Sequence, residues 1–103
     1  MDADAFATIF NPTALVTRRG EGDSVVVTPI AAWLSAVRSL TSPRDAGSAR
    51  ADQILAIVVT GDMALLKLRL RIPPREVTDL LSCFCLNGRW QIVQKVFAAE
   101  PLA

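Results

Sequence analysis

Apolar and polar residues alternate most regularly in the second half of the chain. In residues 63–72, leucine or isoleucine occupies every second position from Leu66 onward, and lysine or arginine lies between them. A period of two places such residues on opposite faces of a β-strand. Residues 50–60 contain a nearly continuous apolar run (54–59), and the segment ends at Gly61-Asp62, a typical turn sequence. We therefore predict two adjacent strands, the second of which ends at Pro73-Pro74.

A β-hairpin is predicted over residues 77–97. Its centre, Asn87-Gly88, is the strongest short signal for a two-residue type I′ turn. This turn sets the register, with Cys85 opposite Trp90 and, further along, Asp79 opposite Val96. One face of the hairpin then carries Asp79, Leu81, Cys83, Cys85, Trp90, Ile92, Gln94 and Val96. The other face carries Thr78, Leu80, Ser82, Phe84, Gln91, Val93, Lys95 and Phe97.

The first half of the chain contains shorter elements. A helix is predicted over residues 2–10, on the helical spacing of Phe6, Ile9 and Phe10, and Asn11-Pro12 ends it. The β-branched segments 13–17 and 23–28 predict two short strands around a polar loop.

A second helix is predicted to begin at Thr28-Pro29 and to end at 41–43. Its apolar stripe consists of Ile30, Trp33, Leu34 and Val37. Short helices followed by long antiparallel strands predict an α+β fold, with helices on one face of a curved sheet. We expect the last four strands to carry the core.

Composition narrows the possible functions. The 103 residues suit a single domain over 1–103, and a net charge of +1 argues against nucleic-acid binding. No apolar run approaches the roughly 18–20 residues that span a membrane. The acidic N-terminus does not resemble a signal peptide, so a cytoplasmic location is expected. The absence of histidine and tyrosine excludes His-dependent catalysis, His-containing metal sites and a phenol donor. We predict no cofactor.

Two segments carry a family resemblance, DADAFATIFNPTALV (2–16) and NGRWQIVQKVF (87–97). Together with Asp79 they resemble the nuclear transport factor 2-like superfamily, and most of all its branch named putative lumazine-binding. The resemblance covers nearly the whole chain, apart from the long helix with which relatives usually begin. It implies a cone-shaped, cystatin-like α+β fold whose helices and concave sheet face enclose a pocket. It also implies homodimers, and a function as an isomerase, dehydratase, cyclase or non-catalytic binding domain.

The resemblance and the hairpin register together define a candidate pocket between the helices and the concave sheet face. We predict binding of a small apolar or aromatic molecule there. Trp33 and Trp90 would stack on such a ligand, or else simply fill the core. The predicted lining consists of Phe6, Phe10, Trp33, Val37, Leu66, Leu68, Asp79, Cys83, Trp90 and Ile92.

Asp79 is the candidate catalytic residue. A carboxylate among apolar walls could act as the general base of an isomerase or cyclase. Alternatively, Asp79 is structural, and it hydrogen-bonds the backbone or pairs with Arg71 or Arg75. Whether the protein is an enzyme stays open at the level of sequence.

The remaining chemistry-bearing residues favour structural roles. Cys83 and Cys85 are one residue apart on a strand, where a disulfide would be strained, and we expect two reduced thiols packed in the core. The basic row Lys67, Arg69 and Arg71 is expected on a solvated or dimer-contacting face, or else at an anion or nucleic-acid site.

A homodimer is predicted through the outer face of the closing hairpin. The residues assigned to this contact are Leu80, Phe84, Val93 and Phe97, which a monomer would leave exposed. A non-catalytic dimerisation or interaction module is therefore a further alternative.

Overall fold

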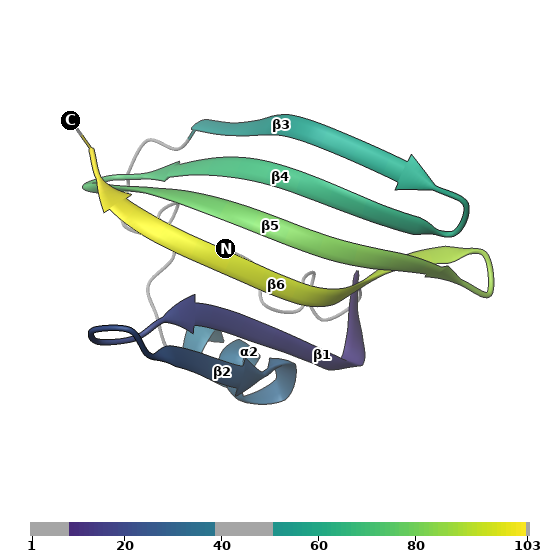
Figure 1. Cartoon of the computed structure of the whole chain (residues 1–103), viewed down its shortest axis with the longest axis horizontal. Helices are drawn as coiled ribbons and strands as arrows, with labels where there is room; N and C mark the ends of the chain where they lie inside the picture. Colours follow the sequence, from purple (N-terminus) through teal and green to yellow (C-terminus); the bar gives the residue numbers. More distant parts are fainter. Residues whose placement is uncertain (1–8, 39–50, 103) are drawn as a thin grey trace.

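The computed structural model describes residues 9–38 and 51–102, which form one helix and six strands (Figure 1). In chain order the elements are β1 (Phe10–Arg19), β2 (Val25–Pro29), α2 (Ile30–Arg38), β3 (Ala51–Thr60), β4 (Met63–Ile72), β5 (Arg75–Leu86) and β6 (Arg89–Pro101).

All six strands belong to one sheet with the order β2-β1-β6-β5-β4-β3. Neighbouring strands are antiparallel except β1 and β6, which run parallel. The last four strands are therefore neighbours in chain order, and the N-terminal hairpin joins them beside the C-terminal strand (Figure 1). The α+β class and the mainly antiparallel sheet predicted from the sequence are confirmed.

The first strand begins earlier than the sequence predicts. Phe10, which the pattern assigned to a helix over 2–10, is the first residue of β1 and pairs with Ile92 of β6. Regular pairing of β1 with β6 resumes at Leu15. Between Phe10 and Leu15, the side-chain Nδ2 of Asn11 donates a hydrogen bond to Oε1 of Gln91 at 2.8 Å. This contact with a distant strand draws the segment into the sheet. Residues 1–8 and the predicted helix end at 41–43 lie outside the described residues.

The two tight turns form where the sequence predicts them. Asn87 and Gly88 have φ values of 53° and 75°, the pair of positive angles that a type I′ turn requires. Gly61 of the β3–β4 turn has a φ of 58°. These turns explain why the strand ends at Thr60, Met63, Leu86 and Arg89 agree with the sequence pattern.

The β5–β6 register departs from the prediction at Val93. Pairing follows the predicted register from the turn to Cys83 opposite Ile92, but the next pair is Ser82 with Gln94. Val93 is therefore an extra residue on β6, a β-bulge, and it inverts the alternation of the residues that follow it.

The bulge corrects the predicted faces of the hairpin. Asp79 lies opposite Phe97 instead of Val96, and Leu81 lies opposite Lys95. Lys95 and Phe97, predicted on the same face as Leu80, thus share the face of Asp79.

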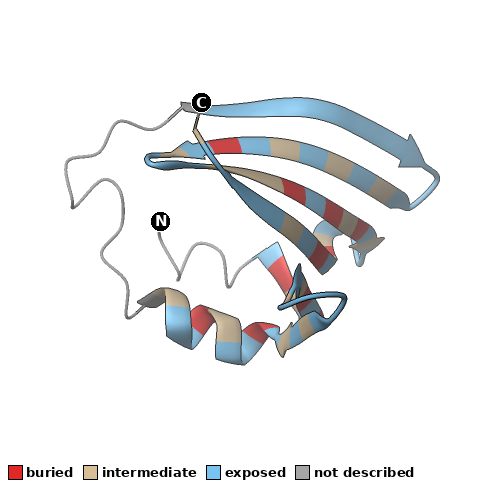
Figure 2. Cartoon of the chain, turned by 60° about the vertical axis from the view of Figure 1, so that its left-hand side comes forward, coloured by how far each residue is buried: buried red, intermediate tan, exposed pale blue. Residues whose placement is uncertain are grey.

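The core lies between α2 and the half of the sheet made by β1, β6 and β5. We call the sheet face on this side the inner face. The buried cluster consists of Phe10, Ala14, Val16, Ile30, Leu34, Leu81, Cys83 and Ile92. The prediction that the last four strands carry the core is correct for β5 and β6, which supply Leu81, Cys83 and Ile92. It is wrong for β3, because residues 52–60 all have exposed side chains (Figure 2). The helix lies beside β1 and β2, at the end of the sheet farthest from β3 (Figure 1).

Deleting Val93 tests the bulge. The deletion removes the extra residue, so Gln94 stays opposite Ser82 and Lys95 stays opposite Leu81 on the inner face, and the variant should still fold with a loss of about 1–2 kcal/mol. Deleting both Val93 and Gln94 places Lys95 opposite Ser82 on the outer face, so it should destabilise the protein severely or prevent folding. Urea unfolding of both variants measures the difference, and a similar loss in both would show that the bulge does not control the register.

Candidate functional site

A buried ion pair occupies the inner face. The Lys95 ammonium lies 3.4 Å from the Oδ2 atom of Asp79. Asp79 is 3% exposed and Lys95 is 5% exposed, and they are the buried charged side chains among the described residues. Removing each ion from water costs several kcal/mol, so the two charges stabilise the fold only when they lie together.

Aromatic rings surround the ammonium of this pair. Its nitrogen lies 4.3 Å from the ring centroid of Trp33 on α2 and 5.2 Å from that of Phe97 on β6. The ring of Phe10 lies 6.0 Å from that of Trp33, tilted by 53°. The negative faces of aromatic rings attract a cation, most strongly where water is excluded. Trp33 and Lys95 therefore tie the helix to the sheet.

The structure corrects the predicted partner of Asp79. From the sequence, a structural Asp79 is expected to pair with Arg71 or Arg75, whereas the cation beside Asp79 is Lys95. The predicted register places Lys95 on the opposite face of the hairpin from Asp79, so the sequence does not assign it to the site. No residue type near Val93 signals a bulge, since neither glycine nor proline is present. Only the register measured in the structure reveals Lys95.

An apolar hollow of about 300 Å³ lies on the inner face, toward the β5–β6 turn. Its lining consists of Ile9, Ile57, Val59, Ala64, Leu66, Cys83, Trp90, Gln91 and Ile92. Leu66, Cys83, Trp90 and Ile92 were predicted to line a pocket together, and this hollow brings them together. We call it the inner hollow.

The other predicted lining residues lie elsewhere. Phe10 belongs to the buried cluster, and Trp33, Val37 and Leu68 pack against that cluster. Phe6 lies outside the described residues. The predicted single pocket is thus divided into a packed region beneath α2 and an inner hollow beyond it.

Ile57 and Val59 are lining residues that the sequence analysis missed. They lie opposite Leu66 and Ala64 across the β3–β4 pair. The Gly61-Asp62 turn sets this register, so extending the prediction from β4 to β3 would have found both residues.

The ion pair and the inner hollow are neighbours on one face. Leu81 lies opposite Lys95 on one side and opposite Leu66 on the other. Asp79 and Cys83 are four residues apart on β5, which corresponds to about 13 Å along a strand. A ligand longer than the inner hollow would therefore extend toward the ion pair.

Both cysteines are free thiols in the structure. Cys83 is buried in the core, and this burial raises the pKa of its thiol. Cys85 is half-buried opposite Trp90, as the register predicts. Within the described residues, no cluster of three or more acidic, cysteine or histidine side chains could hold a metal ion.

The outer face of the sheet is apolar in part. Leu80 and Phe84 are each 41% exposed, and Val93 lines a second hollow of about 350 Å³ beside Phe84. Phe97, the fourth residue assigned to a dimer contact, was placed wrongly, because its ring packs on the core beside Lys95. The homodimer through the outer face stays a prediction, now carried by Leu80, Phe84 and Val93.

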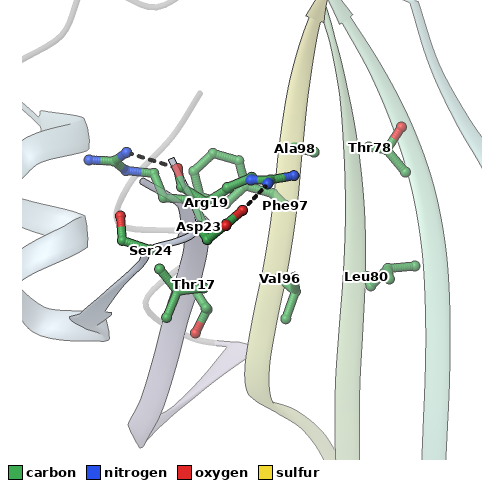
Figure 3. Close-up of a pocket in the computed structure, with 11 residues that line it drawn as sticks. Thr17, Arg19, Asp23, Ser24, Thr78, Leu80, Val96, Phe97 and Ala98 are labelled. Carbon is green, nitrogen blue, oxygen red and sulfur yellow. Dashed lines mark hydrogen bonds and ion pairs between the residues drawn. The ribbon is translucent and has the colours of Figure 1, made fainter. Parts of the chain in front are cut away.

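The largest of these hollows, about 470 Å³, lies between the β1–β2 turn and the outer sides of β5 and β6 (Figure 3). Leu80 and Val96 form part of its floor, and Arg19 lies at its edge. The Arg19 guanidinium lies 3.2 Å from a carboxylate oxygen of Asp23, and both side chains are largely exposed. These two charges compensate each other in water, so this pair offers a ligand little net charge.

The basic row of β4 lies on the outer face, as predicted. Lys67, Arg69 and Arg71 are exposed, and the Nε atom of Arg69 lies 2.7 Å from an oxygen of Glu76. This pairing reduces the positive charge that an anion would meet. In the described part of the chain, no helix has the length and apolar character needed to cross a membrane.

Comparison with known proteins identifies the family. The family model described as putative lumazine-binding matches residues 1–98. The chain belongs to this family. The resemblance noted in the sequence is thereby confirmed. None of the curated proteins compared with the chain matches it.

Solved structures of this family's fold are similar over almost the whole chain. An NTF2-like protein of unknown function from Shewanella baltica OS155 is 18% identical, with 98% of this chain and 80% of that chain covered and a TM-score of 0.84. A second, from Silicibacter pomeroyi DSS-3, is 23% identical, with 96% and 80% covered and a TM-score of 0.81. A cystatin-like fold protein from Burkholderia xenovorans LB400 is 14% identical, with 99% and 79% covered and a TM-score of 0.71. At these identities the similarity shows a shared fold.

Replacing Lys95 tests the buried pair. Lys95→Met removes the ammonium and leaves the Asp79 carboxylate buried beside apolar groups, so it should cost about 3–5 kcal/mol. The double variant Asp79→Leu/Lys95→Met removes both charges and should recover most of that loss. Urea unfolding at pH 7 gives the three free energies. A double variant no more stable than Lys95→Met would show that the pair is not what couples these positions.

Proposed function

We propose that this protein binds a small apolar or aromatic molecule in the inner hollow. The exposure of its apolar wall is the observation that carries the proposal. Trp90 is 45% exposed, Ile57 is 57% exposed and Val59 is 59% exposed, although all three line one hollow. Covering apolar surface gains about 25 cal/mol per Å². A ligand that fills the inner hollow would supply this cover.

The shape and lining favour a flat ligand. About 300 Å³ is at the lower end of the volumes typical of small-molecule sites. An indole such as that of Trp90 offers a planar face on which an aromatic ring can stack. Gln91 is the polar residue among the lining residues, and because its Oε1 accepts a hydrogen bond from Asn11, a hydrogen bond to a ligand would come from its Nε2. Lumazine, the flat heterocycle in the family's description, belongs to this chemical class.

Trp90→Ala should weaken binding of lumazine or of 2-naphthol at least tenfold, because the largest face available for stacking is lost. Phe84→Ala is the matched control, since Phe84 is a similarly exposed aromatic residue outside the inner hollow. This control should change the Kd less than twofold. Isothermal titration measures both, and equal losses of affinity would contradict the proposed site.

A second candidate function is proton transfer by Asp79, as in an isomerase or cyclase. The buried pair favours it, because Asp79 and Lys95 lie together on the face that holds the inner hollow. Asp79 would accept a proton from a carbon next to a ligand carbonyl. The Lys95 ammonium would donate a hydrogen bond to the enolate oxygen that forms. The same proton then returns from Asp79 to another carbon of the ligand, which completes the isomerisation.

Asp79→Asn distinguishes this candidate from binding alone. An apolar ketone that extends beyond the inner hollow, such as 4-(2-naphthyl)butan-2-one, should exchange its α-hydrogens with deuterium in the presence of the wild-type protein, as followed by proton NMR. The variant should lower the protein-dependent rate more than a hundredfold while 2-naphthol still binds. Glu76→Gln, on the outer face of the same strand, is the control and should leave the rate unchanged. Undiminished exchange with Asp79→Asn would remove Asp79 from the chemistry.

A further inference from the structure

The open edge of the sheet at β3 is the least covered part of the described chain. β3 is the last strand in the sheet order, so one side of its backbone has no neighbouring strand. Every side chain from residue 52 to residue 60 is exposed. Ile54 is 64% exposed, and Ile57, Val58 and Val59 are between 57% and 59% exposed. An exposed, apolar edge of this length favours pairing with another strand.

The sequence of β3 lacks two of the usual features that prevent edge pairing, namely proline and basic residues. Its ten residues, ADQILAIVVT, include no proline, lysine or arginine, and Asp52 is the one charged residue. By contrast, the neighbouring β4 carries three basic residues in alternation. Basic residues and proline normally protect the edge strand rather than its neighbour. From Ile54 to Thr60 the open edge is therefore uncharged.

The hairpin register shows which backbone groups point to the open edge. Thr60 and Met63 flank the two-residue turn, and in such a hairpin the flanking pair exchanges both backbone hydrogen bonds. Alternate pairs from there do the same. The backbone groups of Val59 and Ile57 belong to the intervening pairs and consequently point outward, away from β4.

A register shift in β3 gives the first half of the strand, residues 51–54, the same relation between side-chain face and backbone direction. The register shifts between Ile54 and Ala56, which makes Leu55 an extra residue. Beyond it, Ile54 lies opposite Leu68 and Asp52 opposite Leu70. By the same alternation, both residues also direct their backbone groups outward and their side chains to the inner face. Four residues therefore share both properties, namely Asp52, Ile54, Ile57 and Val59.

These four positions are complementary to themselves in an antiparallel pair. In a pair of β3 strands related by a two-fold axis between positions 55 and 56, Ile54 lies opposite Ile57 of the second copy, and Asp52 lies opposite its Val59. In each of these pairs, the backbone N–H and C=O groups of both residues point toward the other copy, and both side chains lie on the inner face. The two Asp52 side chains lie at opposite ends of the contact and do not repel each other. We infer that a second copy of this chain pairs antiparallel with β3 in this register.

The pairing would also complete the inner hollow, and this step rests on the proposed function. Ile57 and Val59 form the wall of the inner hollow at the open edge of the sheet. The second copy adds its Ile54 beside Ile57 on the same face. Its Asp52 side chain adds a carboxylate beside Val59, at the edge of the site. The ligand class is then an apolar or aromatic molecule bound between two copies of the chain, with a hydrogen-bond donor near that edge.

This contact is distinct from the one predicted through Leu80, Phe84 and Val93. That contact uses the outer face of β5 and β6, and the edge contact uses the backbone of β3. Each can therefore be removed without the other.

Amide hydrogen exchange of the wild-type protein, followed by NMR, tests the edge contact directly. The amides of Ile57 and Val59 point outward, and those of Val58 and Thr60 bond to β4 and serve as internal controls. At about 100 µM, all four amides should be protected, and dilution to about 1 µM should release Ile57 and Val59 alone. Unprotected exchange of Ile57 and Val59 at the higher concentration overturns the inference, whatever the oligomeric state.

Light scattering of variants gives an independent measurement. Phe84→Glu removes the outer-face contact and should leave a dimer of about 22 kDa, twice the chain mass of 11.1 kDa. Adding Val59→Pro removes an outward N–H without breaking a bond to β4, and should give the monomer. Adding Val59→Ala in its place retains the N–H and should retain the dimer. A monomer with Phe84→Glu alone overturns the inference, and if this variant does not fold, the exchange experiment decides.

Lumazine titration of the wild-type protein separates the two proposals. Fast exchange at Ile57 and Val59 with lumazine bound would overturn the edge contact and support the proposed function. Protected amides without binding of lumazine or 2-naphthol would support the edge contact and overturn the proposed function.

Discussion

Burial of the Asp79–Lys95 pair is the constraint on which the arrangement of this protein depends. Both side chains are almost completely buried, and neither charge could be held there without the other. Two features are needed to bring them together. The extra residue Val93 turns Lys95 to the inner face, and α2 places the Trp33 ring over the ammonium. A local irregularity in one strand thereby determines where the helix is attached.

The position of α2 in turn determines which surfaces stay open. Ile30 and Leu34 of the helix pack with β1, β5 and β6, so the core forms on that half of the sheet. β3 lies at the far edge, where the helix leaves its apolar residues uncovered. The inner hollow lies between these two regions, with Cys83 and Ile92 at the core side and Ile57 and Val59 at the edge. Attachment of the helix on one side thus creates both the proposed binding site and the proposed contact strand.

A fold does not by itself decide a function, which depends on the side chains that form the site. Here the inner face combines an apolar hollow with a buried acid–base pair, and Leu81 lies between them. An apolar hollow alone is sufficient for binding. The neighbouring pair is the feature that the proposed proton transfer would require. The same pair is buried between the helix and the sheet, so a change at either residue is expected to affect folding as well as any chemistry.

The sequence by itself determined the features that depend on local geometry. Asn87-Gly88 and Gly61-Asp62 set two hairpins, because few residues adopt positive φ without strain, and the period of two assigned the faces of β4. The family followed from the order of such segments. The tertiary structure alone decided the inclusion of Phe10 in the sheet, the bulge at Val93 and the pairing of Asp79 with Lys95. Each of these depends on contacts between segments far apart in the chain. Local preferences are similar for a regular strand and a bulged one, but only the bulged strand brings Lys95 to the buried Asp79.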